Sequence, residues 1–267
     1  SGASVSLSSD GSRLAIGAIA NDGGGNNSGH VRIYQYNNNS WSQLGADIDG
    51  EAAGDLSGYS VSLSSDGSRV AIGANNNDGN GSNSGHVRIY DYNGSAWVQV
   101  GADIDGEAAG DYSGWSVSLS SDGSRVAIGD RNGSNGSGHV RIYQYNNNSW
   151  SQLGADINGE ALNDGSGYSV SLSSDGSRVA IGALGNDGNG TASGHVRIYQ
   201  YNNNSWSQLG ADIDGEALGD YSGASVSLSS DGSRLAIGAI ANDGGGNNSG
   251  HVRIYQYNNN SWSQLGA

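Results

Sequence analysis

The chain has 267 residues and no cysteine, and its net charge of −15 comes from 26 acidic residues against 11 basic ones. The missing cysteines exclude disulfides and thiolate chemistry. The acidic balance disfavours nucleic acids and anionic membranes as partners, because both attract basic surfaces. No apolar run approaches the ~18 residues of a membrane span, so membrane insertion is not expected.

The sequence consists of five repeats, which we expect to form one repeat domain over residues 1–267. The approximate boundaries of the units are 1–56, 57–112, 113–165, 166–221 and 222–267. Residues 222–267 copy residues 1–46 without a difference. Natural repeats usually drift, so this identity indicates recent duplication or engineering.

Each repeat contains four strand patterns, which the second copy illustrates. Residues 60–64 and 69–74 alternate large and small side chains, and Asp66-Gly67 between them supplies the positive φ angles of a tight hairpin turn. Residues 86–92 and about 97–104 predict a third and a fourth strand. No segment has helical periodicity. Four strands per repeat predict an all-β fold, a β-propeller of five four-stranded antiparallel blades.

The alternation within the strands indicates how the blades pack. Val61 and Leu63 lie on one face of the first strand, and Ser60 and Ser62 lie on the other. Sheets with one large and one small face can stack so that large groups fill the space over small ones. The first two strands have the smallest side chains and should lie nearest the axis. We expect a closed ring, with a flat sandwich or an open stack of sheets as the alternative.

Three segments of each repeat resemble a known family. They are Gly-x-Ser-Val-x-Leu-Ser-x-Asp-Gly, Ala-Ile-Gly-Ala and Gly-His-Val-Arg-Ile-Tyr. Together they resemble the FG-GAP repeat of integrin α-subunit propellers and related bacterial surface proteins. The resemblance implies a propeller fold and an extracellular or cell-surface location. The chain departs from the family motifs at Ser57, where the family has Phe, and at Asn75, where it has Pro. The first hairpin turn also lacks the acidic calcium loop of many members.

The connector between repeats is the most charged recurring element, and it is the candidate calcium site. Ca²⁺ takes six to eight oxygen ligands, and alternating acidic side chains around a Gly turn can supply several of them. The alternative is a solvated turn in which Asp caps backbone amides. The candidate ligands are Asp47, Asp49, Glu51, Asp55, Asp103, Asp105, Glu107, Asp111, Asp156, Asn158, Glu160, Asp164, Asp212, Asp214, Glu216 and Asp220.

One tryptophan recurs in each repeat beside Asn and Ser. Aromatic faces near amide groups are typical of sugar-binding sites, and several equivalent sites would give avidity. The alternative is a tryptophan that packs between blades with its N–H group satisfied. The residues are Trp41, Trp97, Trp150, Trp206 and Trp262.

One position varies although its neighbours do not. It holds Tyr59, Trp115 and Tyr168 in the middle repeats and Ala in the first and last. This position begins the innermost strand, so we expect it near one mouth of the axial channel. Arg131 is a second outlier, after the second strand of repeat three. Such variation predicts either a ligand-binding surface or a position without packing constraints.

Each repeat has one histidine, at the start of its third strand, and no second His or Cys lies nearby in the same repeat, so zinc ligation is not expected. The arginine two residues later should pair with a connector carboxylate of its own or the next blade.

The leading functional hypothesis is a non-enzymatic, extracellular or cell-surface propeller that acts in adhesion or as a structural interaction module. The alternatives are a multivalent carbohydrate-binding lectin and an engineered symmetric propeller without an evolved ligand. The expected partner is a protein or a glycan at the cell surface, and self-assembly is a further expectation. Calcium is the one cofactor considered. Near-identical repeats also argue against a single asymmetric active site, so an enzyme is not expected.

Overall fold

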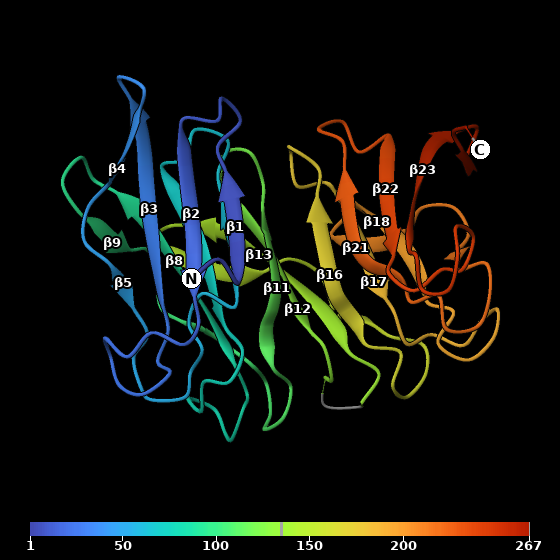
Figure 1. Ribbon diagram of the computed structural model, residues 1–267, viewed down its shortest axis with the longest axis horizontal. Helices are drawn as coiled ribbons and strands as arrows, with labels where there is room; N and C mark the ends of the chain where they lie inside the picture. The colour runs from blue at the N-terminus through green and yellow to red at the C-terminus, as the bar shows by residue number, and fades with distance from the viewer. Residues whose placement is uncertain (134–135, 267) are drawn as a thin grey trace.

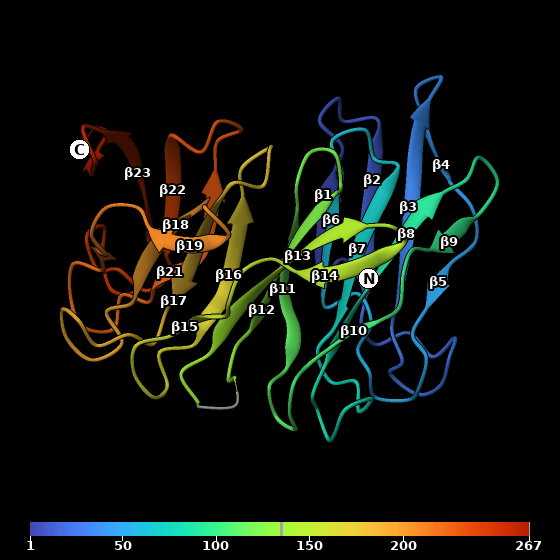
Figure 2. The ribbon, with the colours of Figure 1, turned by 180° about the vertical axis from the view of Figure 1, so that it is seen from behind.

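A computed structural model of the chain describes residues 1–133 and 136–266. The described residues form five antiparallel sheets, which follow one another around a common axis (Figures 1 and 2). The prediction of five antiparallel propeller units is confirmed, although four of the sheets have a fifth, two-residue strand and only the last sheet has four strands. Within the described part of the chain, no helix is long and apolar enough to cross a membrane.

We number the blades 1 to 5 in chain order. Blade 1 comprises β1 (Ser4–Leu7), β2 (Arg13–Ala18), β3 (His30–Asn37), β4 (Ser40–Gln43) and β5 (Ile48–Asp49). Blade 2 comprises β6 (Ser60–Leu63), β7 (Arg69–Ala74), β8 (His86–Tyr92), β9 (Trp97–Gln99) and β10 (Ile104–Asp105). Blade 3 comprises β11 (Ser113–Leu119), β12 (Arg125–Asp130), β13 (His139–Asn146), β14 (Ser149–Gln152) and β15 (Ile157–Asn158). Blade 4 comprises β16 (Ser166–Leu172), β17 (Arg178–Ala183), β18 (His195–Asn202), β19 (Ser205–Gln208) and β20 (Ile213–Asp214). Blade 5 comprises β21 (Ser222–Leu228), β22 (Arg234–Ala239), β23 (His251–Asn258) and β24 (Ser261–Gln264).

The predicted fourth strand is two strands, so its continuous span over residues 97–104 is wrong. Both β9 and β10 pair with β8, one at each end of it. The break falls at Gly101, which has a φ of 78°. A Cβ at this position would lie 2.7 Å from the Trp150 ring of the next blade. The close approach of the neighbouring blade therefore requires glycine here and interrupts the strand.

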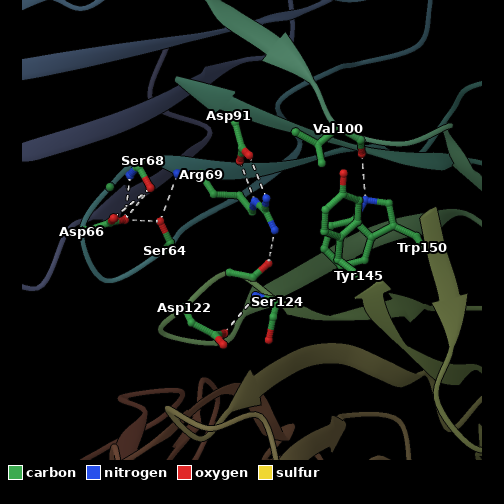
Figure 3. Close-up of polar contacts among 12 residues, drawn as sticks. Ser64, Asp66, Ser68, Arg69, Asp91, Val100, Asp122, Ser124, Tyr145 and Trp150 are labelled. Carbon is green, nitrogen blue, oxygen red and sulfur yellow. Dashed lines mark hydrogen bonds and ion pairs between the residues drawn. The ribbon is translucent and has the colours of Figure 1, made fainter. Parts of the chain in front are cut away.

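The hairpin turn between β6 and β7 forms where the sequence places it, but by a different geometry. Only Gly67 has a positive φ, of 66°, so the expectation of positive angles at Asp66 as well is wrong. Asp66 stabilises the turn through its carboxylate instead, which accepts hydrogen bonds from the Ser68 amide at 2.9 Å and the Ser64 hydroxyl at 2.8 Å (Figure 3).

The hydrophobic core lies between blades. Val61 and Leu63 of blade 2 pack against Ala15 and Ile33 of blade 1, and all four side chains are at most 8 % exposed. Similar clusters lie between blades 2 and 3, 3 and 4, and 4 and 5. The prediction that large groups fill the space over small ones holds at Ala15, but the third strand adds the large Ile33 to the same covered face.

Recurring polar contacts join each blade to the next. Near the axis, the Ser4 hydroxyl donates to the carbonyl of Gly58 at 2.8 Å, and the Ser9 amide donates to Ser65 at 2.9 Å. Both bonds have counterparts at the other three interfaces. Farther out, Arg69 bonds Asp91 of its own blade and the Gly123 carbonyl of the next (Figure 3).

The two terminal blades each keep one face uncovered. Val5 is 64 % exposed, whereas Val61 at the same repeat position is 8 % exposed. On the other terminal blade, Val252 is 66 % exposed, whereas Val87 is fully buried. Among the described residues, none of the recurring inter-blade bonds joins blade 5 to blade 1. The expectation of a closed ring is therefore wrong for this structure, while self-assembly through these faces stays a prediction.

Candidate binding sites

Three grooves of similar composition lie between successive blades. The groove between blades 1 and 2 has a volume of about 240 Å³ and is lined by Asp47 and Asp49 of the connector and by Tyr90 and Trp97 of the next blade. The equivalent groove between blades 2 and 3 measures about 190 Å³, and that between blades 3 and 4 about 260 Å³. Each groove thus combines two aromatic rings with polar side chains of one connector. The second groove contains Asp103, Asp105, Tyr143 and Trp150, and the third Asp156, Asn158, Tyr199 and Trp206.

The groove tryptophans also hold the blades together. The indole N–H of Trp97 donates to the carbonyl of Leu44 in the preceding blade at 2.8 Å. In each of the following blades, the indole N–H of Trp150, Trp206 or Trp262 likewise donates to a backbone carbonyl of the blade before it. Trp41, which has no preceding blade, is 42 % exposed. The indoles therefore have the packing role considered above, and the partly exposed rings of Trp97, Trp150 and Trp206 remain available as groove walls.

The variable aromatic residues meet in one cluster. The ring centroids of Tyr59 and Trp115 lie 4.7 Å apart, and those of Trp115 and Tyr168 lie 5.6 Å apart. Arg131 places its guanidinium 4.6 Å from the Trp115 ring centroid. Trp115 lies within an irregularity of the β11–β12 pairing, where the register shifts between Ser113 and Ser116. Burial raises the pKa of Tyr59 above its ordinary value, and the neighbouring Tyr168 adds to this shift. We call these four residues the aromatic cluster.

Blade 3 differs from the others beside this cluster. Asp130 takes the place of the alanine found in the other blades and is fully buried. Its Oδ2 lies 2.8 Å from His139 Nε2 and 3.0 Å from Arg141 Nη2. Burial alone would lower the pKa of His139, but the hydrogen bond and negative charge of Asp130 outweigh it and raise the pKa. One buried carboxylate thus lies between an imidazole and a guanidinium group.

The connector carboxylates separate into different roles. The last Asp of each connector caps its own turn, as when Asp111 accepts from the Ala108 amide at 2.7 Å. The first, such as Asp103, accepts from a glutamine of its own blade. The glutamate faces the arginine of the following blade, with 3.4 Å between Glu51 Oε1 and Arg88 Nη1. Arg88 therefore pairs with the connector glutamate of the preceding blade, whereas the sequence suggested a connector carboxylate of its own or the next blade. Arg32, which has no preceding blade, binds Asp47 of its own blade.

Clusters with potential metal ligands form around the histidines. His86 Nδ1 lies 3.8 Å from both Glu51 Oε2 and Asp103 Oδ2. His30, His139 and His195 have comparable groups of two carboxylates. None of these groups in the described part of the chain contains three carboxylates of one connector. The predicted calcium site thus has at most two carboxylates of one connector together, beside an imidazole, and it stays a prediction.

Residues 47–90 match the FG-GAP repeat family. They run from the connector of blade 1 through β6 and β7 into β8. The resemblance to FG-GAP repeat propellers is confirmed. The matched segment begins in the connector of blade 1 and ends in β8 of blade 2, so it spans parts of two blades. The search of curated proteins found no match to the chain.

Solved structures with a similar fold include Kuenenia stuttgartiensis hydrazine synthase (TM-score 0.61, 13 % identity), the Pseudomonas aeruginosa periplasmic gluconolactonase (0.65, 17 %) and Acinetobacter baumannii TolB (0.56, 15 %). The matches cover 98 %, 98 % and 95 % of this chain. The chain spans 65 %, 70 % and 51 % of those chains, respectively. At these identities the likeness shows the fold alone.

Proposed function

We propose that the chain is a non-enzymatic, extracellular binding module of the adhesion type, which binds glycans in the grooves between its blades. The observation that carries this proposal is the repetition of one groove at three successive interfaces. Each groove offers aromatic rings, on which the apolar face of a sugar can stack, and carboxylate or amide groups, which accept hydrogen bonds from hydroxyls.

Repetition also explains how weak single sites could serve adhesion. A small open groove holds one or two sugar units with modest affinity. Three grooves on one rigid array can engage a polymeric or surface-bound glycan together, which raises the avidity without new contacts. The same repetition favours binding over catalysis, because a single asymmetric active site would not be expected in copied units.

A glycan array tests the proposal. We expect the wild-type chain to bind a set of glycans, and the D49A/D105A/N158A variant, which loses the equivalent polar group of all three grooves, to bind them at least tenfold more weakly. All three substituted side chains are exposed, so the variant should fold. The matched control is D78A, because Asp78 is an exposed carboxylate outside the three grooves. Failure of the wild-type chain to bind any glycan at high protein concentration would reject glycan binding.

The aromatic cluster supports a second binding surface, for a protein or an anionic ligand. Arg131 is exposed, and no ion pair of its guanidinium occurs among the described residues. A cation beside the three partly exposed rings of Tyr59, Trp115 and Tyr168 could pair with a carboxylate or sulfate group. An R131A variant that retains all binding to acidic peptides and sulfated glycans would remove this second candidate.

A further inference from the structure

The cluster around His86 joins side chains of two blades. Glu51 comes from the connector of blade 1, whereas His86 and Asp103 come from blade 2. The ligand atoms of the three residues lie within 4.8 Å of one another. The same arrangement recurs two interfaces later, where His195 Nδ1 lies 3.8 Å from Glu160 Oε2 and 3.9 Å from Asp212 Oδ2. Neither cluster can be recognised within one repeat, because its glutamate belongs to the preceding one.

The histidine of each cluster is buried and makes no hydrogen bond. His86 and His195 are both 1 % exposed. Their Nε2 atoms are without hydrogen-bond partners, and no bond of either Nδ1 occurs among the described residues. Leaving a buried polar group unpaired is costly. At 3.8 Å the two carboxylate oxygens are too far away for hydrogen bonds, so His86 Nδ1 lies beside two carboxylates without a hydrogen bond to either.

The carboxylate oxygens that do not lie nearest His86 interact with other side chains. Asp103 Oδ1 accepts a 2.6 Å hydrogen bond from Gln99, and Glu51 Oε1 lies 3.4 Å from Arg88 Nη1. Each carboxylate therefore keeps its other oxygen directed at His86 Nδ1. Outer hydrogen bonds that orient the ligands in this way are typical of metal sites.

We propose that the clusters Glu51–His86–Asp103 and Glu160–His195–Asp212 bind two divalent transition-metal ions of the zinc type, each joining two adjacent blades. One imidazole nitrogen and two carboxylate oxygens are zinc ligands, and a water can occupy the fourth position. Ligand atoms about 2.0–2.2 Å from zinc lie about 3.3–3.6 Å apart in tetrahedral geometry, so the Nδ1–oxygen separations of 3.8–3.9 Å need to shorten by a few tenths of an ångström. A nitrogen ligand and few oxygens favour this class over Ca²⁺.

The other blades provide internal controls. In blade 3, Asp130 already pairs with His139 Nε2 at 2.8 Å. In blade 1, His30 lies beside Asp47 and Asp49, but Asp47 binds Arg32 at 2.8 Å, and no glutamate from a preceding blade takes part. We therefore expect two ions per chain. Asp103 belongs both to a cluster and to the second groove, but His86 and His195 line none of the three grooves, so the histidine variants test metal binding apart from the proposed glycan binding.

The test is zinc titration of the metal-stripped full chain, followed by calorimetry and native mass spectrometry. We expect two Zn²⁺ ions per wild-type chain and a higher melting temperature with zinc. H86Q should bind one ion, H86Q/H195Q none, and the control H30Q two. Since buried histidines can be needed for folding, D103N/D212N serves as a second pair with partly exposed side chains, and it should also bind none. A wild-type chain that binds no zinc, or a stoichiometry that both double variants leave unchanged, would overturn the inference.

Discussion

The indole Nε1 of Trp97 donates a 2.8 Å hydrogen bond to the carbonyl oxygen of Leu44, which lies in the preceding blade. One side chain thereby satisfies a backbone acceptor across an interface and forms part of the groove wall. Because the repeats copy this bond and the uncovered end of blade 1 lacks it, the chain offers a matched control for each inter-blade contact.

Replacing Trp97 by Phe should destabilise the chain by about 1 kcal/mol relative to Trp41→Phe. The substitution at 97 removes the hydrogen bond to Leu44, which is worth about 0.5–1.5 kcal/mol. The substitution at 41 removes an N–H group on an uncovered face. Urea unfolding of both variants measures the difference. Equal stability of the two variants would mean that the bond contributes nothing.

Ile89→Ala should cost about 2–5 kcal/mol, the usual range for a large-to-small substitution in a core. Ile89 is 1 % exposed between blades 2 and 3, whereas Ile254 at the same repeat position is 46 % exposed. Ile254→Ala should cost less than about 1 kcal/mol. Chemical denaturation compares the two variants. A large loss at Ile254 would indicate that a partner covers the free face of blade 5 in solution.

Gly182→Ala should be far more damaging than Gly238→Ala. A Cβ at Gly182 would lie 2.1 Å from the carbonyl oxygen of Gly223 in the next blade, which is backbone and cannot move away easily. At Gly238 the only close group is the Ser225 hydroxyl of the same blade, which can rotate. We expect a loss of about 3 kcal/mol or more at Gly182 and about 1 kcal/mol or less at Gly238. Thermal unfolding that shifts both variants equally would contradict the inter-blade packing described above.

Acid should destabilise the hairpin turns between about pH 4 and pH 2. Hydrogen bonds from the Ser12 amide and the Ser8 hydroxyl lower the pKa of Asp10 to about 2. At the equivalent turn, burial would raise the pKa of Asp66, but bonds from Ser68 and Ser64 outweigh it and lower the pKa. A lowered pKa in the folded state means that this stability is present above the unfolded pKa of about 4 and is lost as the pH falls.

The comparison of wild type with D66N isolates this effect from the histidines, which both proteins share. Between pH 4 and pH 2, the urea midpoint should fall more steeply in the wild type than in D66N. Parallel curves would show that the Asp66 carboxylate does not stabilise the folded turn.

The sequence predicts individual strands well, because the side-chain pattern that forms a strand lies within that strand. The second and third strands of blade 2 have the predicted bounds, residues 69–74 and 86–92. The fourth strand was wrong because its break at Gly101 depends on Trp150 of the next blade. The sequence also identified Tyr59, Trp115 and Tyr168 of the aromatic cluster, since they occupy one repeat position, and it identified Arg131 as an outlier after the second strand of repeat three.

The histidine clusters could not be derived from one repeat. Their glutamates come from the preceding blade, so recognising them requires knowing which faces meet. The uncovered faces of blades 1 and 5 were not predictable either, because the repeat pattern is the same whether or not the ring closes. Such features depend on the angle between blades, which no single strand pattern encodes.

The most direct test of the proposed function is the number of ligands that one chain binds. A short oligosaccharide selected from the glycan array would be titrated into the wild-type chain by isothermal calorimetry, while tryptophan fluorescence is followed in parallel. Three equivalent grooves predict at least three ligands per chain and a fluorescence change that D49A/D105A/N158A reduces. A single bound ligand, with the fluorescence change unaltered in that variant, would contradict binding in the grooves.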